Sequence, residues 1–252
     1  MVEYRVLPAG DTALVIEFGD RIDRELSTIV LSLAQALDAQ RIAGIVETVP
    51  TFRSLMIHYE PLALPAAALV SRIDEEMRGL SAGKVAGRLW RLPACYDPQL
   101  GIDLEDVAAR CALTTAQVVE RHGATVYHVY MLGFLPGQAY LGEVAPELAL
   151  DRLETPRSKI PAGSVAIAAA MCCVFPQETP CGWRIIGRCP VPLWDAAGAR
   201  ALLAPGDRVA FTPISAREYE AFSAAAAEGR LRVEPVREPV SDPVRKNIGA
   251  AA

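Results

Sequence analysis

The sequence predicts an α+β protein in which a small N-terminal α+β sandwich is followed by a domain of short strands. Two patterns lead to this prediction. Residues 4–78 alternate strand-like and helix-like runs in the order ββαββα, whereas beyond residue 125 short apolar runs are separated by Gly and Pro turns. The chain has 252 residues, 52% of them apolar, which suits one large domain or two modest ones.

The N-terminal segment is expected to form an antiparallel sheet with helices on one face. Apolar residues recur at three- and four-residue intervals over residues 21–39, which indicates an amphipathic helix. A second helical period covers residues 65–78, with Pro65 suited to the first turn. Strands are predicted over residues 4–7, 12–18, 42–49 and 54–59.

A domain boundary is predicted within the small, weakly hydrophobic segment 80–87. The predicted domains are therefore residues 1–83 and residues 84–235. Residues 236–252 are rich in Pro and charged side chains and are expected to be poorly ordered.

The second domain is expected to open with a strand over residues 88–94 and two short helices. Asp103 is the predicted N-cap of the first helix, and Thr114 caps the second, with Gln117 completing a capping box. Repeated short strands then predict a β-barrel or sandwich. The remaining elements are strands over 125–132, 164–174, 183–188 and 207–212 and a helix over 219–228.

Composition disfavours several classes of protein. Lys and Arg number 25 and Asp and Glu 30, so the net charge of −5 argues against a nucleic-acid binder. The sequence shows neither a signal pattern nor an apolar run long enough to span a membrane, so we expect a cytoplasmic protein. The six cysteines and three histidines lack zinc-ligand spacing, so we expect reduced thiols and no metal site.

Arginines recur in the turn-rich stretch from Tyr127 to Arg188. Arg184 and Arg188 share strand parity and are therefore expected to project from one face. With Arg157 nearby they would bind a carboxylate, a phosphate or a carbonyl, because the guanidinium group grips planar oxyanions. The alternative is a solvated rim of arginines paired with Asp or Glu.

Three further motifs have structural explanations beside their functional ones. His122 ends a predicted helix, where the dipole stabilises a cation, and an acid/base role would need a titratable partner. Ser164 lacks the nucleophile elbow and suits a turn serine. Gly83-Lys84-Val85 lacks the first glycine and the last residue of a P-loop, so any ATP is not held in a standard loop.

Several of these motifs together resemble one known family. The motifs are Gly10–Leu14, Leu92–Asp97, Gly101–Leu104, His122, Tyr130–Phe134, Pro136-Gly137, Tyr140–Gly142, Thr155–Arg157, Pro161–Ile167 and Gly182–Arg188. They resemble the B subunits of 5-oxoprolinase, a family also called allophanate hydrolase subunit 1 or carboxyltransferase subdomain C/D. It includes the KipI-type kinase inhibitors.

The resemblance implies a fold, an activity and partners. The fold would be the small α+β domain followed by a cyclophilin-like β-barrel. The chain would act with proteins like the C and A subunits of 5-oxoprolinase in the ATP-dependent opening of 5-oxoproline to glutamate, and would be inactive alone. In the inhibitor branch, the barrel would instead bind a histidine kinase.

The candidate site combines this resemblance with the residue patterns. His122, Arg157 and Arg188 are the candidate catalytic residues: a possible acid/base and two groups for a developing oxyanion. The candidate substrate-binding residues are Arg184, Gly137, Tyr140, Gly163, Ser164, Gly182 and Trp183.

Four residues beside these motifs depart from the family pattern: His128, Gln138, Cys181 and Cys189. The segment Ala169–Cys173 departs from it as well. They leave the substrate open. Allophanate or another urea-derived amide is the alternative substrate, and docking on a sensor kinase is the alternative function.

Overall fold

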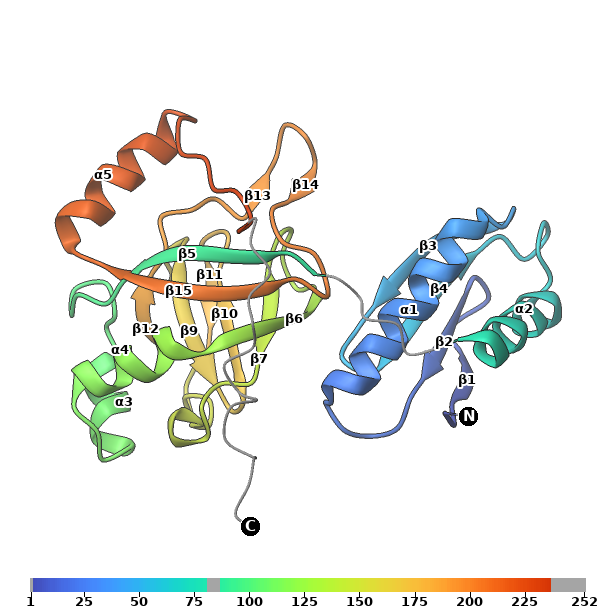
Figure 1. Cartoon of the computed structure of the whole chain (residues 1–252), viewed down its shortest axis with the longest axis horizontal. Coiled ribbons are helices and arrows are strands. Elements are labelled where there is room, and N and C mark those ends of the chain that lie inside the picture. The colour runs from blue at the N-terminus through green and yellow to red at the C-terminus, as the bar shows by residue number, and fades with distance from the viewer. Residues whose placement is uncertain (1, 81–86, 237–252) are drawn as a thin grey trace, which may run out of the picture.

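The computed structural model describes residues 2–80 and 87–236. They form two units with separate cores, an α+β unit followed by a closed β-barrel (Figure 1). The predicted order of an α+β sandwich and a β-barrel is confirmed. Most of the predicted boundary segment, including Gly83-Lys84-Val85, and the tail 237–252 lie outside the described residues.

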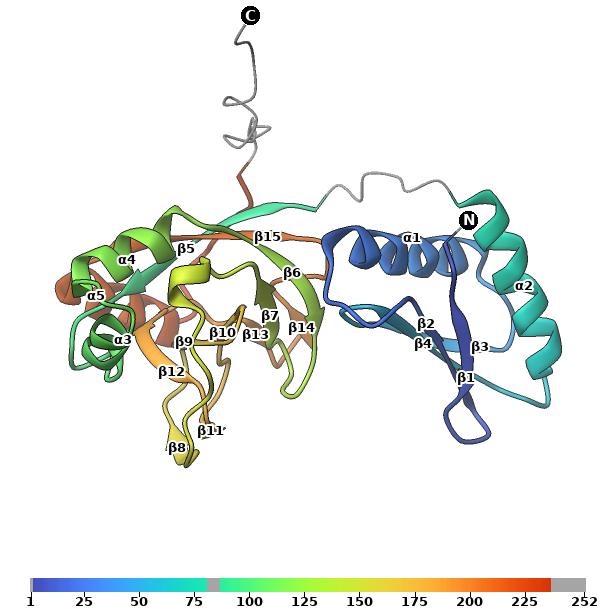
Figure 2. The same cartoon turned by 90° about the horizontal axis from the view of Figure 1, so that it is seen from below.

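The N-terminal sheet is antiparallel, in the order β1-β2-β4-β3. Helices α1 and α2 pack on one face of it (Figure 2). The Asp23 carboxylate caps α1 by accepting from the Glu25 and Leu26 N–H groups at 2.8 and 3.2 Å. The elements are β1 Arg5–Pro8, β2 Ala13–Glu17, α1 Arg24–Gln40, β3 Ile45–Pro50, β4 Ser54–Tyr59 and α2 Ala66–Gly79.

The core of this unit follows from the two periodicities that the sequence shows. Ile16 and Ile57 point inward from the strands, and Leu33 and Ile73 from the helices, all of them fully buried. Burial of one apolar face per element therefore closes the sandwich, as predicted.

The second unit is a closed barrel in the strand order β10-β7-β6-β15-β5-β12-β9. Its pairings are antiparallel except that β15 runs parallel to β5, with Arg208 opposite Leu89. Closure leaves no free edge among these strands. The barrel strands are β5 Leu89–Cys95, β6 Val126–Leu132, β7 Ala139–Gly142, β9 Ser164–Ala168, β10 Met171–Val174, β12 Arg184–Arg188 and β15 Arg208–Ile214.

In the described part of the second unit, three helices, a 3-10 turn and two small two-stranded sheets lie outside the barrel strands. The capping box of Thr114 and Gln117 begins α4 as predicted. A second box, made by Ser215 and Glu218, begins α5 three residues before the helix that the sequence predicts. The further elements are α3 Leu104–Arg110, α4 Thr115–Ala124, α5 Ala216–Ala227, the 3-10 turn η1 Pro146–Leu148, and the ribbons β8 Arg157–Ile160 with β11 Thr179–Cys181 and β13 Trp194–Asp195 with β14 Arg200–Ala201.

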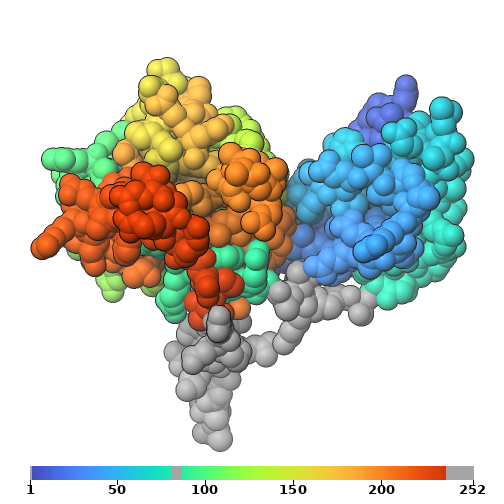
Figure 3. Space-filling view, turned by 90° about the horizontal axis from the view of Figure 1, so that it is seen from above, coloured from blue at the N-terminus to red at the C-terminus, as the bar shows by residue number. Residues whose placement is uncertain are grey.

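The two units lie side by side (Figure 3) and touch through polar and aromatic contacts. The Ser27 hydroxyl of α1 and the His128 Nε2 of β6 are hydrogen-bonded at 3.1 Å. The Phe52 ring lies 5.8 Å from the Tyr130 ring and 5.7 Å from the Tyr140 ring. The N-terminal unit therefore contacts the wall of the barrel that carries β6 and β7.

In the described part of the chain, no helix is long and apolar enough to cross a membrane.

Candidate functional site

A cavity of about 210 Å³ opens on the barrel beside β7 and β11. Its walls are mainly aromatic and apolar, with two polar side chains of different kinds, an arginine and a glutamine. The lining residues are Phe134, Gln138, Tyr140, Arg152, Pro156, Phe175, Pro180, Cys181, Gly182 and Trp183. A small concave site with few polar groups is the usual form of a binding pocket.

The aromatic wall is built around Trp183, which is 7% exposed. Its ring meets the Tyr140 ring edge-on at 6.0 Å and the Phe175 ring edge-on at 6.3 Å. The Trp183 backbone N–H donates to Cys181 Sγ at 3.1 Å. The edge-on ring contacts therefore orient the indole, and the bond to Cys181 anchors the Trp183 backbone.

Arg152 supplies the positive charge of the cavity. Its Cζ lies 5.8 Å from the centroid of the Trp183 ring, within cation–π range. Within the described residues no carboxylate forms an ion pair with it. The guanidinium is therefore available to an anionic ligand.

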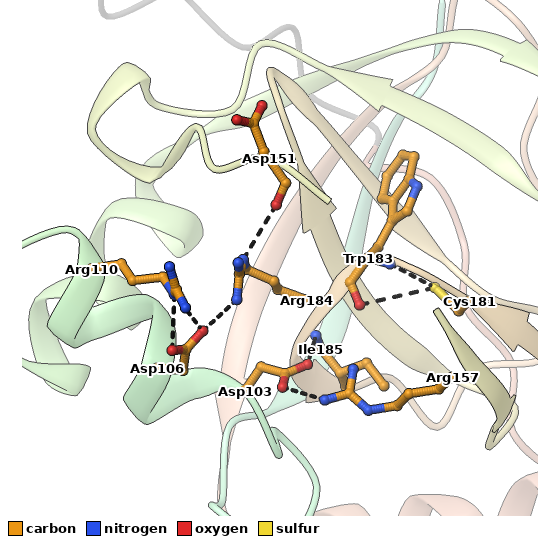
Figure 4. Close-up of polar contacts among 9 residues, drawn as sticks. All are labelled: Asp103, Asp106, Arg110, Asp151, Arg157, Cys181, Trp183, Arg184 and Ile185. Carbon is orange, nitrogen blue, oxygen red and sulfur yellow. Dashed lines mark hydrogen bonds and ion pairs between the residues drawn. The ribbon is translucent and has the colours of Figure 1, made fainter. Parts of the chain in front are cut away.

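The backbone on either side of Arg152 is anchored. The Leu150 carbonyl accepts from Ala169 N–H at 2.7 Å, and the Leu153 N–H donates to the Gly182 carbonyl at 2.7 Å. Arg184 Nε donates to the Asp151 carbonyl at 3.3 Å (Figure 4). These bonds fix the loop that presents Arg152, although the loop has no regular secondary structure.

Gln138 is the second polar group of the cavity wall and is 1% exposed. Its backbone closes the turn before β7, since Gly133 N–H donates to its carbonyl at 3.1 Å and its N–H donates to the Leu135 carbonyl at 3.0 Å. Its Nε2 lies 3.8 Å from Cys173 Sγ, and its Oε1 has no hydrogen-bond partner among the described residues. A buried amide oxygen without a hydrogen-bond partner lowers the free energy of unfolding, so it is rarely kept without a structural or functional reason.

Three of the predicted substrate-binding residues, Tyr140, Gly182 and Trp183, line this cavity. Burial raises the pKa of the Tyr140 hydroxyl above its ordinary value, and the Cys173 thiol adds to the shift. Tyr140 therefore carries its proton at neutral pH and remains a hydrogen-bond donor.

Arg157 and Arg184 are neutralised by carboxylates at the start of α3 (Figure 4). Arg157 pairs with Asp103 at 2.5 Å, and Arg184 pairs with Asp106, which Arg110 also contacts at 2.9 Å. Of the two interpretations that the sequence left open, the structure shows arginines paired with Asp for these two residues.

Asp103 occupies the N-cap position of α3 as predicted, but its side chain does not cap the helix. One carboxylate oxygen accepts from Arg157, and the other accepts from the Ile185 N–H at 2.7 Å. Asp103 therefore joins α3 to β12 and to β8.

The predicted alignment of Arg184 and Arg188 on one face is wrong. Arg184 lies opposite Ile167 and Arg188 opposite Ser164, with an irregularity in register between Ile185 and Gly187. Because Ile167 and Ser164 are an odd number of residues apart on β9, they face opposite sides of the sheet. Arg184 and Arg188 therefore lie on opposite faces of the bulged strand β12.

Arg188 stands apart from the cavity. Its Nε is buried and has no hydrogen-bond partner in the described part of the chain. Its Cγ lies near Gly163, where φ is +78° and an added Cβ would approach the Cys189 carbonyl to 2.3 Å. Gly137 also has φ of +78°, and a Cβ there would lie 2.7 Å from the Leu193 carbonyl. Both glycines are required by backbone shape.

Ser164 and His122 lie inside the structure and away from the cavity wall. The Ser164 hydroxyl is fully buried and donates to the Pro161 carbonyl at 2.7 Å, as a turn serine does. His122 is fully buried in the barrel core, where its Nδ1 is hydrogen-bonded to the Tyr96 hydroxyl at 2.7 Å. Burial lowers the pKa of His122 to about 3, so the ring is neutral. The catalytic roles of His122, Arg157 and Arg188 stay predictions.

The departures from the family pattern fall into two groups. Gln138 and Cys181 line the cavity, whereas His128 lies at the contact with the N-terminal unit and Cys189 in the barrel core. All six cysteines are free, and all but the partly exposed Cys111 are buried. Within residues 2–80 and 87–236, no cluster of three or more His, Cys, Asp or Glu could hold a metal ion.

Comparison with known proteins agrees with this architecture. The family model for the carboxyltransferase domain, subdomain C and D, matches residues 4–204. The chain belongs to this family. The B subunit of 5-oxoprolinase from Bacillus subtilis (strain 168) is 34% identical over 233 residues, covering 88% of this chain and 97% of the relative. That of Escherichia coli O157:H7 is 36% identical over 217 residues, covering 84% and 97%. The crystal structure of TTHA0988 superposes with a TM-score of 0.73 at 33% identity, covering 80% of this chain and 40% of the other.

The sequence did not point to Arg152 as a site residue, and it marked Gln138 only as a departure from the family. Arg152 stands outside the turn motifs, between Asp151 and Leu153, in a segment without periodicity. Gln138 does follow the Pro136-Gly137 turn, which is the signal that would have drawn attention to it.

Proposed function

We propose that this chain is a non-autonomous subunit of an ATP-dependent amide hydrolase whose substrate is 5-oxo-L-proline. The reaction would be 5-oxo-L-proline, ATP and water to L-glutamate, ADP and phosphate. The observation that carries the proposal is the similarity to the B subunits of 5-oxoprolinase, which spans 97% of two relatives at 34% and 36% identity.

The chemistry of the substrate explains why several subunits and ATP would be needed. Amide resonance makes the lactam carbonyl a poor electrophile, and phosphorylation of its oxygen would create a good leaving group. ATP would be the phosphoryl donor, and proteins like the C and A subunits of 5-oxoprolinase would complete the enzyme. The cavity supports a binding role for this chain, because it combines the cationic Arg152 with an aromatic wall.

The test is reconstitution. The chain is co-expressed with proteins of the C and A types, and phosphate and glutamate are measured with and without 5-oxo-L-proline. We expect phosphate release that depends on 5-oxo-L-proline, matched by glutamate and lost when this chain is left out. A stable complex that is inactive with 5-oxo-L-proline but active with allophanate would change the substrate. A complex inactive with every amide would refute the enzymatic role.

A further inference from the structure

We infer that the mouth of the cavity beside Trp183 is the docking surface for the companion protein, a protein like the C subunit of 5-oxoprolinase, and that the Phe134 ring is the anchor. Phe134 lies in the turn between β6 and β7, at the edge of the cavity wall. The inference rests on the proposed function, in which the companion protein helps to complete the enzyme. The companion would cover the mouth with an apolar surface that carries a carboxylate at its border.

The cavity lacks a group that the proposed reaction needs. Among the described residues that line it, none is an Asp, a Glu, a His or a Lys. Tyr140 and Cys181 carry exchangeable protons, but burial raises the pKa of both groups above their ordinary values, so both stay protonated at neutral pH. A general base needs a pKa near the working pH. Under the proposed function, the base must therefore reach the mouth of the cavity from another protein.

Phe134 presents an exposed aromatic ring at this mouth. It is 67% exposed, whereas the neighbouring Leu135 packs against the aromatic cluster that contains Trp183. A phenylalanine buries about 150–250 Å² when it is enclosed, so roughly 100 Å² or more of apolar surface is left uncovered at this ring. A substrate small enough for a cavity of about 210 Å³ could reach only the edge of the ring that faces the cavity. The surface of a second protein is large enough to cover the rest.

The backbone holds Phe134 in a conformation that costs free energy. Its φ is +71°, in the left-handed region that residues with a Cβ rarely adopt. The turn around it is closed by two hydrogen bonds, from Gly133 N–H to the Gln138 carbonyl at 3.1 Å and from Gln138 N–H to the Leu135 carbonyl at 3.0 Å. Glycine or asparagine would fit this position at a lower cost. A strained residue whose ring is largely left outside the fold indicates a role beyond the fold.

The neighbours of Phe134 suit a rigid contact with an acidic border. Pro156 and Pro180 line the cavity and are exposed, and proline loses little side-chain entropy when it is buried. The exposed Arg152 has no carboxylate partner within the described residues. An ordered aromatic anchor among rigid apolar neighbours is typical of an interface hot spot, and the cation favours a carboxylate on the partner.

The position of these segments leaves them open to a large partner. The turn between β6 and β7 and the ribbon of β8 and β11 project from the side of the barrel opposite β5 and β15 (Figure 2). A second protein can therefore approach the mouth of the cavity from this side.

The experiment measures assembly and folding separately. The isolated full chain is titrated with the purified companion protein by isothermal titration calorimetry. Phe134→Gly removes the ring and relieves the positive φ, whereas Phe134→Tyr keeps a ring. Ala199→Gly is the matched control, because Ala199 also has a positive φ, of +48°, and is exposed in the turn between β13 and β14, outside the cavity wall.

We expect Phe134→Gly to raise the Kd for the companion protein by about thirtyfold or more, the loss typical of a hot-spot aromatic. Phe134→Tyr should stay within about threefold of the wild type, and Ala199→Gly should bind as the wild type does. Both glycine variants should keep or raise Tm, because relief of the positive φ offsets the greater freedom of glycine in the unfolded chain. Arg152→Gln should weaken binding by a smaller factor and reduce its dependence on salt.

Unchanged affinity in Phe134→Gly would overturn the inference, and so would a fall in its Tm, since the ring would then support the fold. Two results would assign the ring to another occupant. Unchanged affinity for the companion with a raised KM for 5-oxo-L-proline would mean that the ring covers the substrate. A dimer of the isolated chain, seen by size-exclusion chromatography and lost in Phe134→Gly, would mean that the mouth joins two copies of this chain.

The proposed function would stand after each of these results. In contrast, a complex that depends on Phe134 but turns over no amide would support the docking surface and refute the proposed enzyme.

Discussion

Arg184 and Asp151 lie far apart in the sequence, yet Arg184 Nε donates a hydrogen bond to the Asp151 carbonyl at 3.3 Å. The same guanidinium pairs with Asp106 on α3, and its side chain is only 8% exposed. Arg184 therefore connects the first turn of α3 to the loop that carries Arg152. We regard it as a positioning residue that acts through Arg152.

The first prediction concerns this connection. Arg184→Lys keeps a cation for Asp106, but a single ammonium group cannot reproduce the separate guanidinium donors to Asp106 and to the Asp151 carbonyl. The free energy of unfolding should fall by about 1–2 kcal/mol, less than for a fully buried pair because Asp106 is partly exposed and keeps Arg110.

In the reconstituted enzyme, the same variant should raise KM for 5-oxo-L-proline several-fold more than it lowers kcat, because the Arg152 loop loses an anchor. Arg110→Gln removes the more exposed partner of Asp106 and should change stability by no more than about 0.5 kcal/mol. An unchanged KM in Arg184→Lys would mean that Arg184 only stabilises the fold.

The second prediction concerns Asp103, whose side chain is 8% exposed and accepts from both Arg157 and the Ile185 N–H. In Asp103→Asn, the amide NH₂ must face one of these two donors, so a buried donor loses its acceptor. We expect a loss of about 2–3 kcal/mol in the free energy of unfolding, measured by urea denaturation.

A matched control is Asp11→Asn, which changes an exposed aspartate in the turn before β2 and should cost less than about 0.5 kcal/mol. If Asp103→Asn unfolds at the same urea concentration as the wild type, then the bonds of Asp103 contribute little, and Arg157 is not held by it.

The third prediction concerns the buried amide of Gln138. Gln138→Leu replaces a buried amide with an unsatisfied Oε1 by an apolar side chain of similar size. The free energy of unfolding should therefore rise by about 1 kcal/mol.

Thermal denaturation measures this change in stability. Gln177→Leu serves as a control, because Gln177 is exposed and lies outside the cavity wall. A Gln138→Leu variant that loses stability would show that the buried amide supports the fold.

Most of the fold could be predicted because its signals are local. The spacing of Leu26 and Leu33 in α1 and the capping box of Thr114 in α4 depend on residues within one or two helical turns. The missed strands β7, β8, β11, β13 and β14 are two to four residues long, so they carry too few residues to show a periodicity. The single strand predicted over residues 164–174 is wrong, because the structure has two strands there, β9 and β10, which pair antiparallel.

The candidate site could be predicted only in part, because its decisive contacts are not local. The strand parity of Arg184 and Arg188 assumed a regular strand, and the bulge near Ile186 reverses it. Asp103 appeared to be a helix cap, since nothing in the neighbouring sequence shows that Arg157, in a distant strand, is bonded to it.

The last prediction concerns acid sensitivity and follows from two buried histidines. Burial lowers the pKa of His122 to about 3, and burial together with the positive charge of Arg24 lowers the pKa of His128 to about 4. In the unfolded chain both rings should titrate near about 6.5. Below that pH the unfolded chain binds protons that the folded chain does not, so stability is complete above about pH 6.5 and falls as the pH decreases.

Between about pH 6.5 and 5, before most carboxylates titrate, the free energy of unfolding should fall by up to about 1.4 kcal/mol per pH unit for His122. The contribution of His128 should be nearly as large over this range, because a folded-state pKa of about 4 keeps its ring neutral down to about pH 5. His128→Asn should therefore reduce the slope of stability against pH, even though it also weakens the contact with Ser27.

Ser27→Ala is the matched control, since it removes the hydroxyl partner at 3.1 Å and leaves the imidazole in place, so the slope should persist. Urea denaturation at several pH values measures these slopes, and an equal slope in His128→Asn and the wild type would show that His128 does not contribute to the acid sensitivity.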